Sequence, residues 1–108
     1  GSPVSRGRVT GVARIVRTIE EASALQRGEI LIAPITDVGW TPYFSLIAGL
    51  VTDIGSAVSH GAVVAREYGL PAVVNTRIAT RVFSTGDRIV LDGESGIVRL
   101  AEDDPAAP

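Results

Sequence analysis

The stretch at residues 50–74, LVTDIGSAVSHGAVVAREYGLPAVV, decides the fold of this chain. It opens with a short run at 50–54 that predicts a strand, and a loop of small residues follows. A helix is predicted over 59–68, where apolar residues form a buried stripe. The Gly-Leu-Pro that comes next ends this helix, and 72–74 predicts another strand. The stretch therefore predicts a strand, a small-residue loop, a helix and a second strand.

Two further helices are predicted on the N-terminal side of this stretch. Thr18 is followed three residues later by Glu21, and this pair is typical of a capping box at a helix start. Gly28 ends the helix that the box opens. Thr41 precedes a proline, an arrangement typical of an N-cap followed by the first helical residue, and this second helix runs to roughly Ala48.

Strands are predicted on both sides of these helices. Alternating apolar and polar residues with glycine breaks at 4–17 indicate short strands or a hairpin, and 29–33 is an apolar run that a proline stops. The segments 88–92 and 97–100, joined by Gly-Glu-Ser-Gly, indicate a hairpin. Strands alternate with helices in the middle of the chain, and antiparallel pairs lie at both ends. The predicted fold class is therefore mixed α/β, not a doubly wound sheet.

The length of the chain predicts a single domain. With 108 residues it has room for one domain of ordinary size and one core. We expect residues 1–101 to form this domain. The polar, proline-containing segment 102–108 is expected to be a flexible tail.

Composition and charge exclude several function classes. A net charge of -2, with the basic residues scattered, argues against a nucleic-acid partner and against recruitment to an anionic membrane. No apolar run is long enough to span a membrane, and the expected location is cytoplasmic. The chain has no cysteine and one histidine, and its acidic residues follow no metal-ligand spacing. We therefore expect no metal site, and very few residues are left to carry the chemistry.

The single histidine, His60, lies where the predicted helix begins. A helix start leaves unpaired backbone N–H groups with about half a positive charge, which favours a bound phosphate. Gly55 and Gly61 would let the backbone approach such a group without a Cβ in the way. The hydroxyl groups of Ser56 and Ser59 would add hydrogen bonds or cap the helix.

The same position favours a neutral imidazole, whose free lone pair is a nucleophile for phosphorus. Two plainer interpretations stay open at this point. A lone histidine is often an ordinary surface or core residue, and glycines and serines before a helix are common caps and turns. No general base lies near His60 in the sequence, which argues against Ser-His-Asp hydrolysis.

The segment at 55–74 resembles the phosphohistidine signature of phosphoenolpyruvate-utilizing enzymes. Further likenesses to this family are the opening at 1–7, the Asp-Val-Gly-Trp-Thr-Pro loop at 37–42 and the closing hairpin at 86–96. The loop and Gly61 are similar to the phosphoenolpyruvate synthase and rifampin phosphotransferase branch. Many members have a threonine where this chain has Val58, and in plant pyruvate phosphate dikinases that threonine is a regulatory phosphorylation site. The resemblance therefore implies that this control is absent here.

The resemblance implies a three-layer β/β/α swivelling domain that carries phosphoryl groups. His60 would be phosphorylated at an ATP-grasp domain and would deliver the group to an acceptor-binding domain of the same parent protein. Its acceptor would be pyruvate or a hydroxylated small molecule such as a rifamycin. Gly55, Ser56, Ser59 and Gly61 would surround the phosphate. Arg66 is the signature arginine, with either a phosphate contact or a structural ion pair as its role.

The resemblance also implies where the cofactors bind. The chain contains no P-loop sequence, so ATP and Mg²⁺ are expected in the partner domain and none in this one. The isolated chain should then be catalytically incompetent. An alternative is a free-standing phosphoryl carrier or regulatory module that docks on separate proteins. Trp40, Tyr43 and Phe44 indicate core packing or a docking face, and Asp37 and Asp53 indicate turns, or residues that steer a substrate or a magnesium ion.

Overall fold

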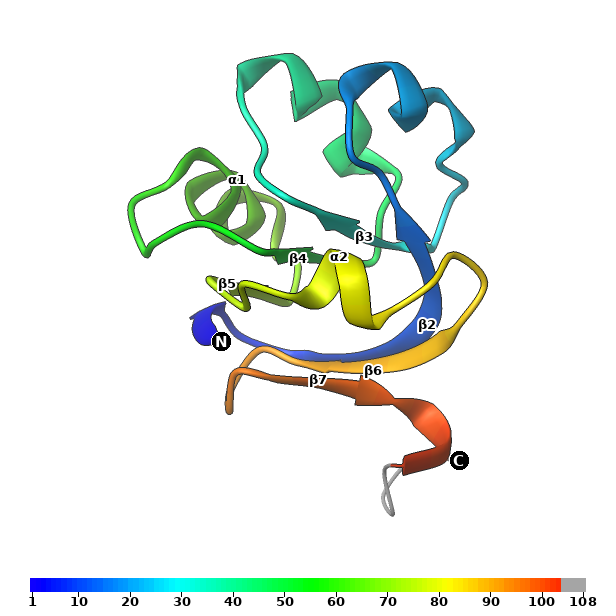
Figure 1. Cartoon of the computed structure of the whole chain (residues 1–108). Helices are drawn as coiled ribbons and strands as arrows, with labels where there is room; N and C mark the ends of the chain where they lie inside the picture. Colours follow the sequence, from blue (N-terminus) through cyan, green and yellow to red (C-terminus); the bar gives the residue numbers. More distant parts are fainter. Residues whose placement is uncertain (104–108) are drawn as a thin grey trace.

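A curled seven-stranded sheet organises the computed structural model, which describes residues 1–103 (Figure 1). Four neighbouring strands, β5, β4, β3 and β2, run parallel, and antiparallel strands extend the sheet at both edges. The order across the sheet is β1-β5-β4-β3-β2-β6-β7. The strands are β1 (Ser2–Ser5), β2 (Arg8–Ile15), β3 (Ile30–Ala33), β4 (Gly49–Thr52), β5 (Ala72–Val74), β6 (Arg88–Asp92) and β7 (Ile97–Leu100).

The helices are short and lie mainly on one side of the parallel strands (Figure 1). They comprise two α-helices and three 3₁₀ helices among the described residues. These are α1 (His60–Tyr68), α2 (Ala79–Val82), η1 (Ile19–Ala24), η2 (Val38–Ser45) and η3 (Ala101–Asp103). Of the predicted tail, Glu102 and Asp103 belong to η3, and 104–108 lie outside the described residues.

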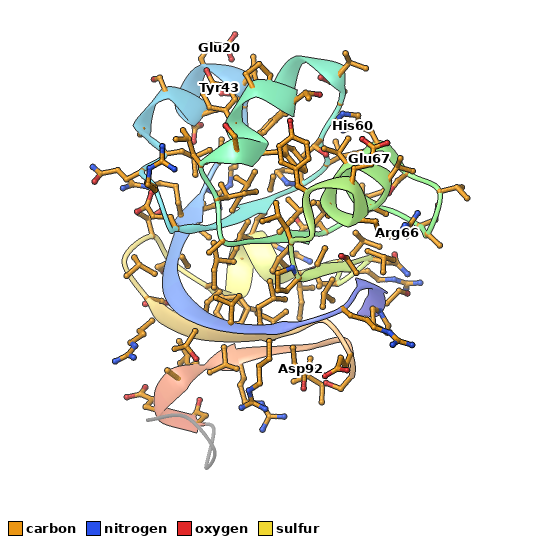
Figure 2. The ribbon with its side chains drawn as sticks, turned by 180° about the vertical axis from the view of Figure 1, so that it is seen from behind. Glu20, Tyr43, His60, Arg66, Glu67 and Asp92 are labelled. Atoms are coloured by element: carbon orange, nitrogen blue, oxygen red, sulfur yellow. The ribbon has the colours of Figure 1, made fainter. Side chains whose placement is uncertain are left out.

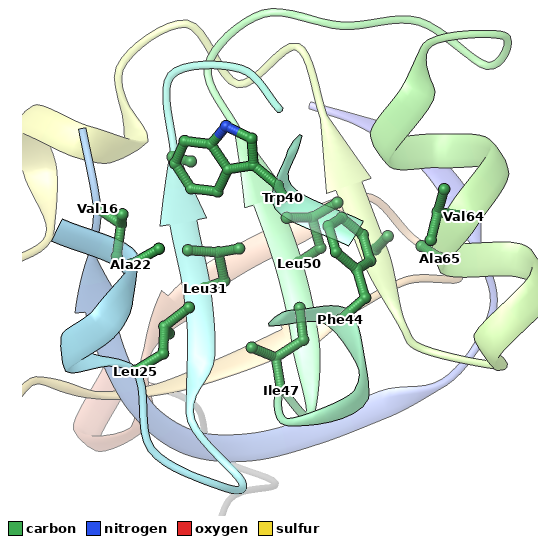
Figure 3. Packing of buried hydrophobic residues seen from close by; sticks show 12 residues of the cluster. Val16, Ala22, Leu25, Leu31, Trp40, Phe44, Ile47, Leu50, Val64 and Ala65 are labelled. Atoms are coloured by element: carbon green, nitrogen blue, oxygen red, sulfur yellow. The ribbon is translucent and has the colours of Figure 1, made fainter. Parts of the chain in front are cut away.

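Alternate residues of the central strands belong to two separate hydrophobic clusters. In β3, Leu31 and Ala33 join the cluster beneath the helices, whereas Ile30 and Ile32 join the cluster that contains residues of β6. All four residues of β3 are buried, as expected of a parallel strand covered on both faces. Figure 3 shows the first cluster, where Trp40 and Phe44 of η2 pack over the sheet. The predicted β/β/α layering and the mixed α/β class are therefore confirmed.

The residues at 50–74 fold as predicted. β4 ends at Thr52, α1 begins at His60 with Ser59 as its N-cap, and β5 follows. Gly69 has φ +69° at the C-cap of α1, and its N–H donates to the carbonyls of Ala65 and Arg66. This left-handed conformation is the reason for glycine at that position.

Other local predictions need correction. The strands within 4–17 do not form a hairpin, because β1 pairs with β5 while β2 pairs with β3 and β6. The two N-terminal helices are 3₁₀ rather than α-helical. The first ends at Ala24, well before Gly28, and the Thr18 side chain makes no capping bond. The second begins at Val38, and the helix α2 was not predicted at all.

The C-terminal hairpin is confirmed, and a carboxylate holds its turn. Asp92 accepts hydrogen bonds from the backbone N–H of Glu94 at 2.9 Å and of Ser95 at 3.2 Å. The Glu94 N–H in particular stabilises the charged form and lowers the pKa of Asp92. This hairpin lies on the far side of the molecule from His60 (Figure 2).

Candidate functional site at His60

His60 is the first residue of α1, beyond the carboxyl end of β4. The loop at 53–59 leads to it and is held by backbone hydrogen bonds. The Ile54 N–H donates to the Pro34 carbonyl at 2.9 Å, and the Ser59 N–H donates to the Ser56 carbonyl at 3.1 Å. The histidine is half-buried, so one part of its ring packs and another part meets solvent. Carboxyl ends of parallel strands are where such folds place their ligands.

Two threonine hydroxyl groups hold the imidazole, one at each ring nitrogen. Thr36 Oγ1 lies 3.3 Å from Nδ1, and Thr41 Oγ1 lies 3.2 Å from Nε2. The ring of Phe44 meets the imidazole edge to face, with centroids 5.8 Å apart and planes at 82°. The ring is therefore fixed in both position and plane by residues of a single neighbouring segment, 36–44.

The two nitrogens have different surroundings. Thr36 is buried, with 6% of its surface exposed, whereas Thr41 is half-buried at the outer side of the site. A neutral imidazole carries its proton on one nitrogen and a lone pair on the other, and a hydroxyl group can serve either. The Nδ1 side of the ring therefore faces the more buried of the two threonines, and the Nε2 side faces the more exposed one.

Gly61 makes room for the contact between Thr36 and His60. A Cβ at this position would lie 2.8 Å from Thr36 Oγ1 and 3.0 Å from Leu50 Cδ2, closer than side chains pack. Gly61 is buried in the first turn of α1, directly against the hydroxyl group that holds Nδ1. The absence of a side chain at Gly61 therefore allows Thr36 to hold the histidine, and the sequence alone did not indicate this role.

The serines of the loop bond within the loop itself. Ser59 Oγ donates to the Ser56 carbonyl at 2.8 Å and makes no capping bond to α1, so the predicted capping by this hydroxyl group is wrong. Ser56 Oγ accepts from the Val58 N–H at 3.4 Å. A Cβ at Gly55 would lie 3.2 Å from Ser59 Oγ and 3.1 Å from Val74 Cβ, so close packing also requires this glycine.

Arg66 points to a different side of α1 from His60 (Figure 2). One of its terminal nitrogens donates to the Val4 carbonyl of β1 at 2.9 Å, and the other donates to the Ala57 carbonyl in the loop before His60. The guanidinium thus ties the loop to the edge of the sheet. Among residues 1–103, Arg66 bonds to carbonyl groups and forms no ion pair, and a direct phosphate contact stays a prediction.

The other polar candidates have structural partners. Asp53 is buried, and its two carboxylate oxygens accept from Thr80, one from the N–H at 3.0 Å and one from the hydroxyl group at 2.5 Å. Asp37 is the N-cap of η2 and accepts from the Gly39 N–H at 2.9 Å. Trp40 and Phe44 are core residues, which confirms the packing interpretation for both. These contacts account for each of these side chains within the fold.

Among residues 1–103, no group of three or more histidine, aspartate or glutamate side chains could hold a metal ion. Within the same residues no helix is long and apolar enough to cross a membrane.

Sequence reasoning missed the two threonines that hold the ring. The sequence indicates no role for Thr36, it predicts Thr41 as an N-cap, and it indicates only packing or docking for Phe44. A signal for Thr41 did exist, because it lies in the 37–42 loop that carries part of the family resemblance. Its contact with His60 joins segments that are far apart in sequence, and local patterns do not predict such pairs.

A family model described as "PEP-utilising enzyme, mobile domain" matches residues 25–96. The chain belongs to this family. The prodigiosin synthesizing transferase PigC of Serratia marcescens is 50% identical over 99 residues, which cover 91% of this mobile domain and 11% of that protein. A rifampicin phosphotransferase of Bacillus cereus is 49% identical over 100 residues, which cover 93% of the mobile domain and 11% of that protein.

A solved structure agrees with this assignment. The solution structure of the Enzyme I protein nEIt matches with a TM-score of 0.67 and 31% identity, covering 80% of the mobile domain and 35% of that chain. The mobile domain thus spans about a tenth of the two curated relatives, which are 11% covered. The resemblance to the rifampin phosphotransferase branch is confirmed.

Proposed function

We propose that His60 accepts a phosphoryl group from ATP at an ATP-grasp domain and delivers it to an acceptor at another domain of the same parent protein. The observation that carries this proposal is the held imidazole at the start of α1, with the buried Thr36 at Nδ1 and the half-buried Thr41 at Nε2. Nε2 attacks the phosphorus, and the leaving nucleotide oxygen keeps the electron pair of the broken P–O bond. Nδ1 keeps its proton and donates it to Thr36.

The backbone of α1 supports this assignment. The first-turn N–H groups of a helix attract an anion, and Ser59 does not use its hydroxyl group to cap them. In the proposal the amides near His60 and Gly61 and the hydroxyl group of Ser56 contact the phosphoryl oxygens. Gly55 and Ser59 shape the loop, and Arg66 holds it against β1 through Ala57.

Exposed aliphatic side chains around His60 support docking onto partner domains. They lie on the segments that meet at the histidine, namely the end of β3, the start of η2 and the loop after β4. The exposed fractions are 84% for Val58, 78% for Val38, 61% for Ile54 and 54% for Ile35. An apolar rim that is covered on docking would exclude water, and exclusion of water limits hydrolysis of a phosphorylated intermediate.

The relatives support a multidomain parent rather than a free-standing carrier. This chain corresponds to 11% of the rifampicin phosphotransferase of Bacillus cereus, so most of such a protein lies in other domains. In the proposal those domains bind ATP with Mg²⁺ and the acceptor, which is pyruvate or a hydroxylated small molecule such as a rifamycin. The reaction takes place in the cytoplasm, where ATP is available.

The test uses the parent protein with ATP labelled at the β or the γ position. The wild type should take up acid-labile, base-stable label, and the His60→Ala variant should take up none. Label from the β position would indicate dikinase chemistry, and label from the γ position would indicate a simple kinase. Equal labelling of wild type and variant, or no labelling of a folded wild type, would contradict the proposal.

A further inference from the structure

We propose that Thr41 is a latch on His60: its hydroxyl group donates to the lone pair of Nε2 and must turn away before phosphoryl transfer. The inference rests on the proposed function, because it concerns the nitrogen that becomes phosphorylated. Thr41 Oγ1 lies 3.2 Å from Nε2, within hydrogen-bond distance. A lone pair that accepts this bond is not available to attack phosphorus. The conformation described here is therefore the closed, unreactive one.

The direction of the bond follows from the partner on the other nitrogen. If Nε2 is the nucleophile, the single proton of the neutral ring is on Nδ1, and Thr36 accepts it at 3.3 Å. The hydroxyl group at Nε2 must then be a donor. The two threonines together favour the tautomer that attacks through Nε2, while Thr41 keeps that nitrogen occupied until the transfer.

The hydrogen bond between Thr41 and Nε2 must break by rotation of the threonine side chain rather than of the histidine ring. Phe44 is fully buried and packs its ring against the imidazole at 82°, which restricts rotation of the histidine. The backbone of Thr41 is fixed as well, because Trp40 and Phe44 on either side are anchored in the core. The Thr41 side chain is only half-buried, so turning about its Cα–Cβ bond is the movement with the smallest cost.

After the transfer the same hydroxyl group has a second use. In the phosphorylated state Nε2 has no lone pair, and phosphoryl oxygens lie where the lone pair pointed. A hydroxyl group beside them can donate to one of these oxygens. Thr41 should therefore slow the uptake of the phosphoryl group and also slow its loss.

Phosphoramidate provides a test that needs no partner domain. The Nε2 lone pair forms an N–P bond while the P–N bond of the reagent breaks. The nitrogen of zwitterionic phosphoramidate already carries three hydrogens, so ammonia leaves with the electron pair of that bond and Nδ1 keeps its proton. Phosphohistidine formation in this chain is followed by ³¹P NMR, and its loss is followed after removal of the reagent. Thr41→Val keeps the side-chain shape without the hydroxyl group, and Thr41→Ser keeps the hydroxyl group.

Thr41→Val should be phosphorylated about three- to tenfold faster than the wild type, which corresponds to one lost hydrogen bond, and should lose the group faster. Thr41→Ser should keep both wild-type rates. Thr36→Val should react more slowly, because the tautomer with a free Nε2 lone pair loses its support. Equal or slower phosphorylation of a folded Thr41→Val variant would overturn the latch.

A measurement on the wild type keeps the inference testable if Thr41→Val does not fold. ¹⁵N NMR of His60 at a pH where the ring is neutral should show the proton on Nδ1, and a proton on Nε2 would overturn the inference. These experiments use neither ATP nor a partner domain. Failure of the latch and failure of the parent protein to take label from ATP are therefore separate results.

Discussion

Asp53 and His60 lie beyond the same end of β4, yet their surroundings differ in kind. The Asp53 carboxylate is buried and accepts from the backbone N–H and the hydroxyl group of Thr80, so a backbone group is one of its partners. His60 is half-buried and is held by the hydroxyl groups of Thr36 and Thr41, which can rotate. Asp53 thus has one backbone partner that cannot rotate away, whereas both hydrogen-bond partners of the His60 ring are hydroxyl groups.

The backbone of Asp53 is also held by hydrogen bonds to other segments of the fold. Its N–H donates to the Ala33 carbonyl at 3.1 Å, and its carbonyl accepts from the Arg77 N–H at 2.8 Å. Arg77 has φ +71°, a left-handed conformation that costs free energy and persists only where the surroundings impose it. One end of β4 thus lies beside both a buried carboxylate anchored to the backbone and a half-buried histidine held by side chains.

Asp53→Ala should give the largest loss of stability among the variants that separate these two regions. The substitution leaves the Thr80 N–H buried without an acceptor, and we expect the free energy of unfolding to fall by about 2 kcal/mol. Urea unfolding of this chain measures the change. Phosphorylation of His60 by phosphoramidate should keep its wild-type rate while the variant is folded. An Asp53→Ala variant with wild-type stability and an altered rate of His60 phosphorylation would contradict the structural role of Asp53.

Gly61→Ala should affect both stability and the histidine. The new Cβ would lie 2.8 Å from Thr36 Oγ1. The clash should cost about 1–3 kcal/mol, and the better helix propensity of alanine offsets about 1 kcal/mol of it. A net loss of about 1 kcal/mol is expected, with a change in the ¹⁵N shifts of the His60 ring. Thr36→Ala removes the clashing atom, so the double variant should lose less than the sum of the two single variants.

Arg66→Lys should have the smallest effect on stability. A lysine cannot reach the carbonyls of Val4 and Ala57 with two separate nitrogens, so the loop before His60 loses part of its anchor. We expect a loss below about 1 kcal/mol, because these bonds are exposed. Amide hydrogen exchange should become faster at 55–59. Glu67→Gln on the same helix is the control, and equal exchange in the two variants would contradict the anchoring role.

The sequence predicted the part of the fold that local rules determine. Gly69 at a helix end and the apolar runs of β3 and β5 follow from residue type and spacing, and the structure contains them as expected. The 3₁₀ character of η1 and η2 did not follow from capping signals. Trp40 and Phe44 of η2 are drawn onto the sheet by packing, and tertiary contacts of this kind override local propensity.

The candidate site could be located from the sequence but not assembled. The glycines, the serines and the helix start identified His60 as the residue to consider, and the family resemblance gave it a role. Thr36 and Thr41 act through contacts that cross from one segment to another, and only the order of the strands brings them to the ring. The packing that requires glycine at position 61 could not be predicted either, because its neighbour Thr36 is distant in sequence.

The most direct test of the account is acid-labile labelling of the parent protein by ATP, with wild type and His60→Ala side by side. If His60 carries the phosphoryl group, label should appear on the wild type alone. The isolated His60→Ala chain should still unfold cooperatively, within about 1 kcal/mol of the wild type, because a half-buried ring contributes little packing. Label that persists in the variant would contradict the account, since His60 would then not carry the phosphoryl group.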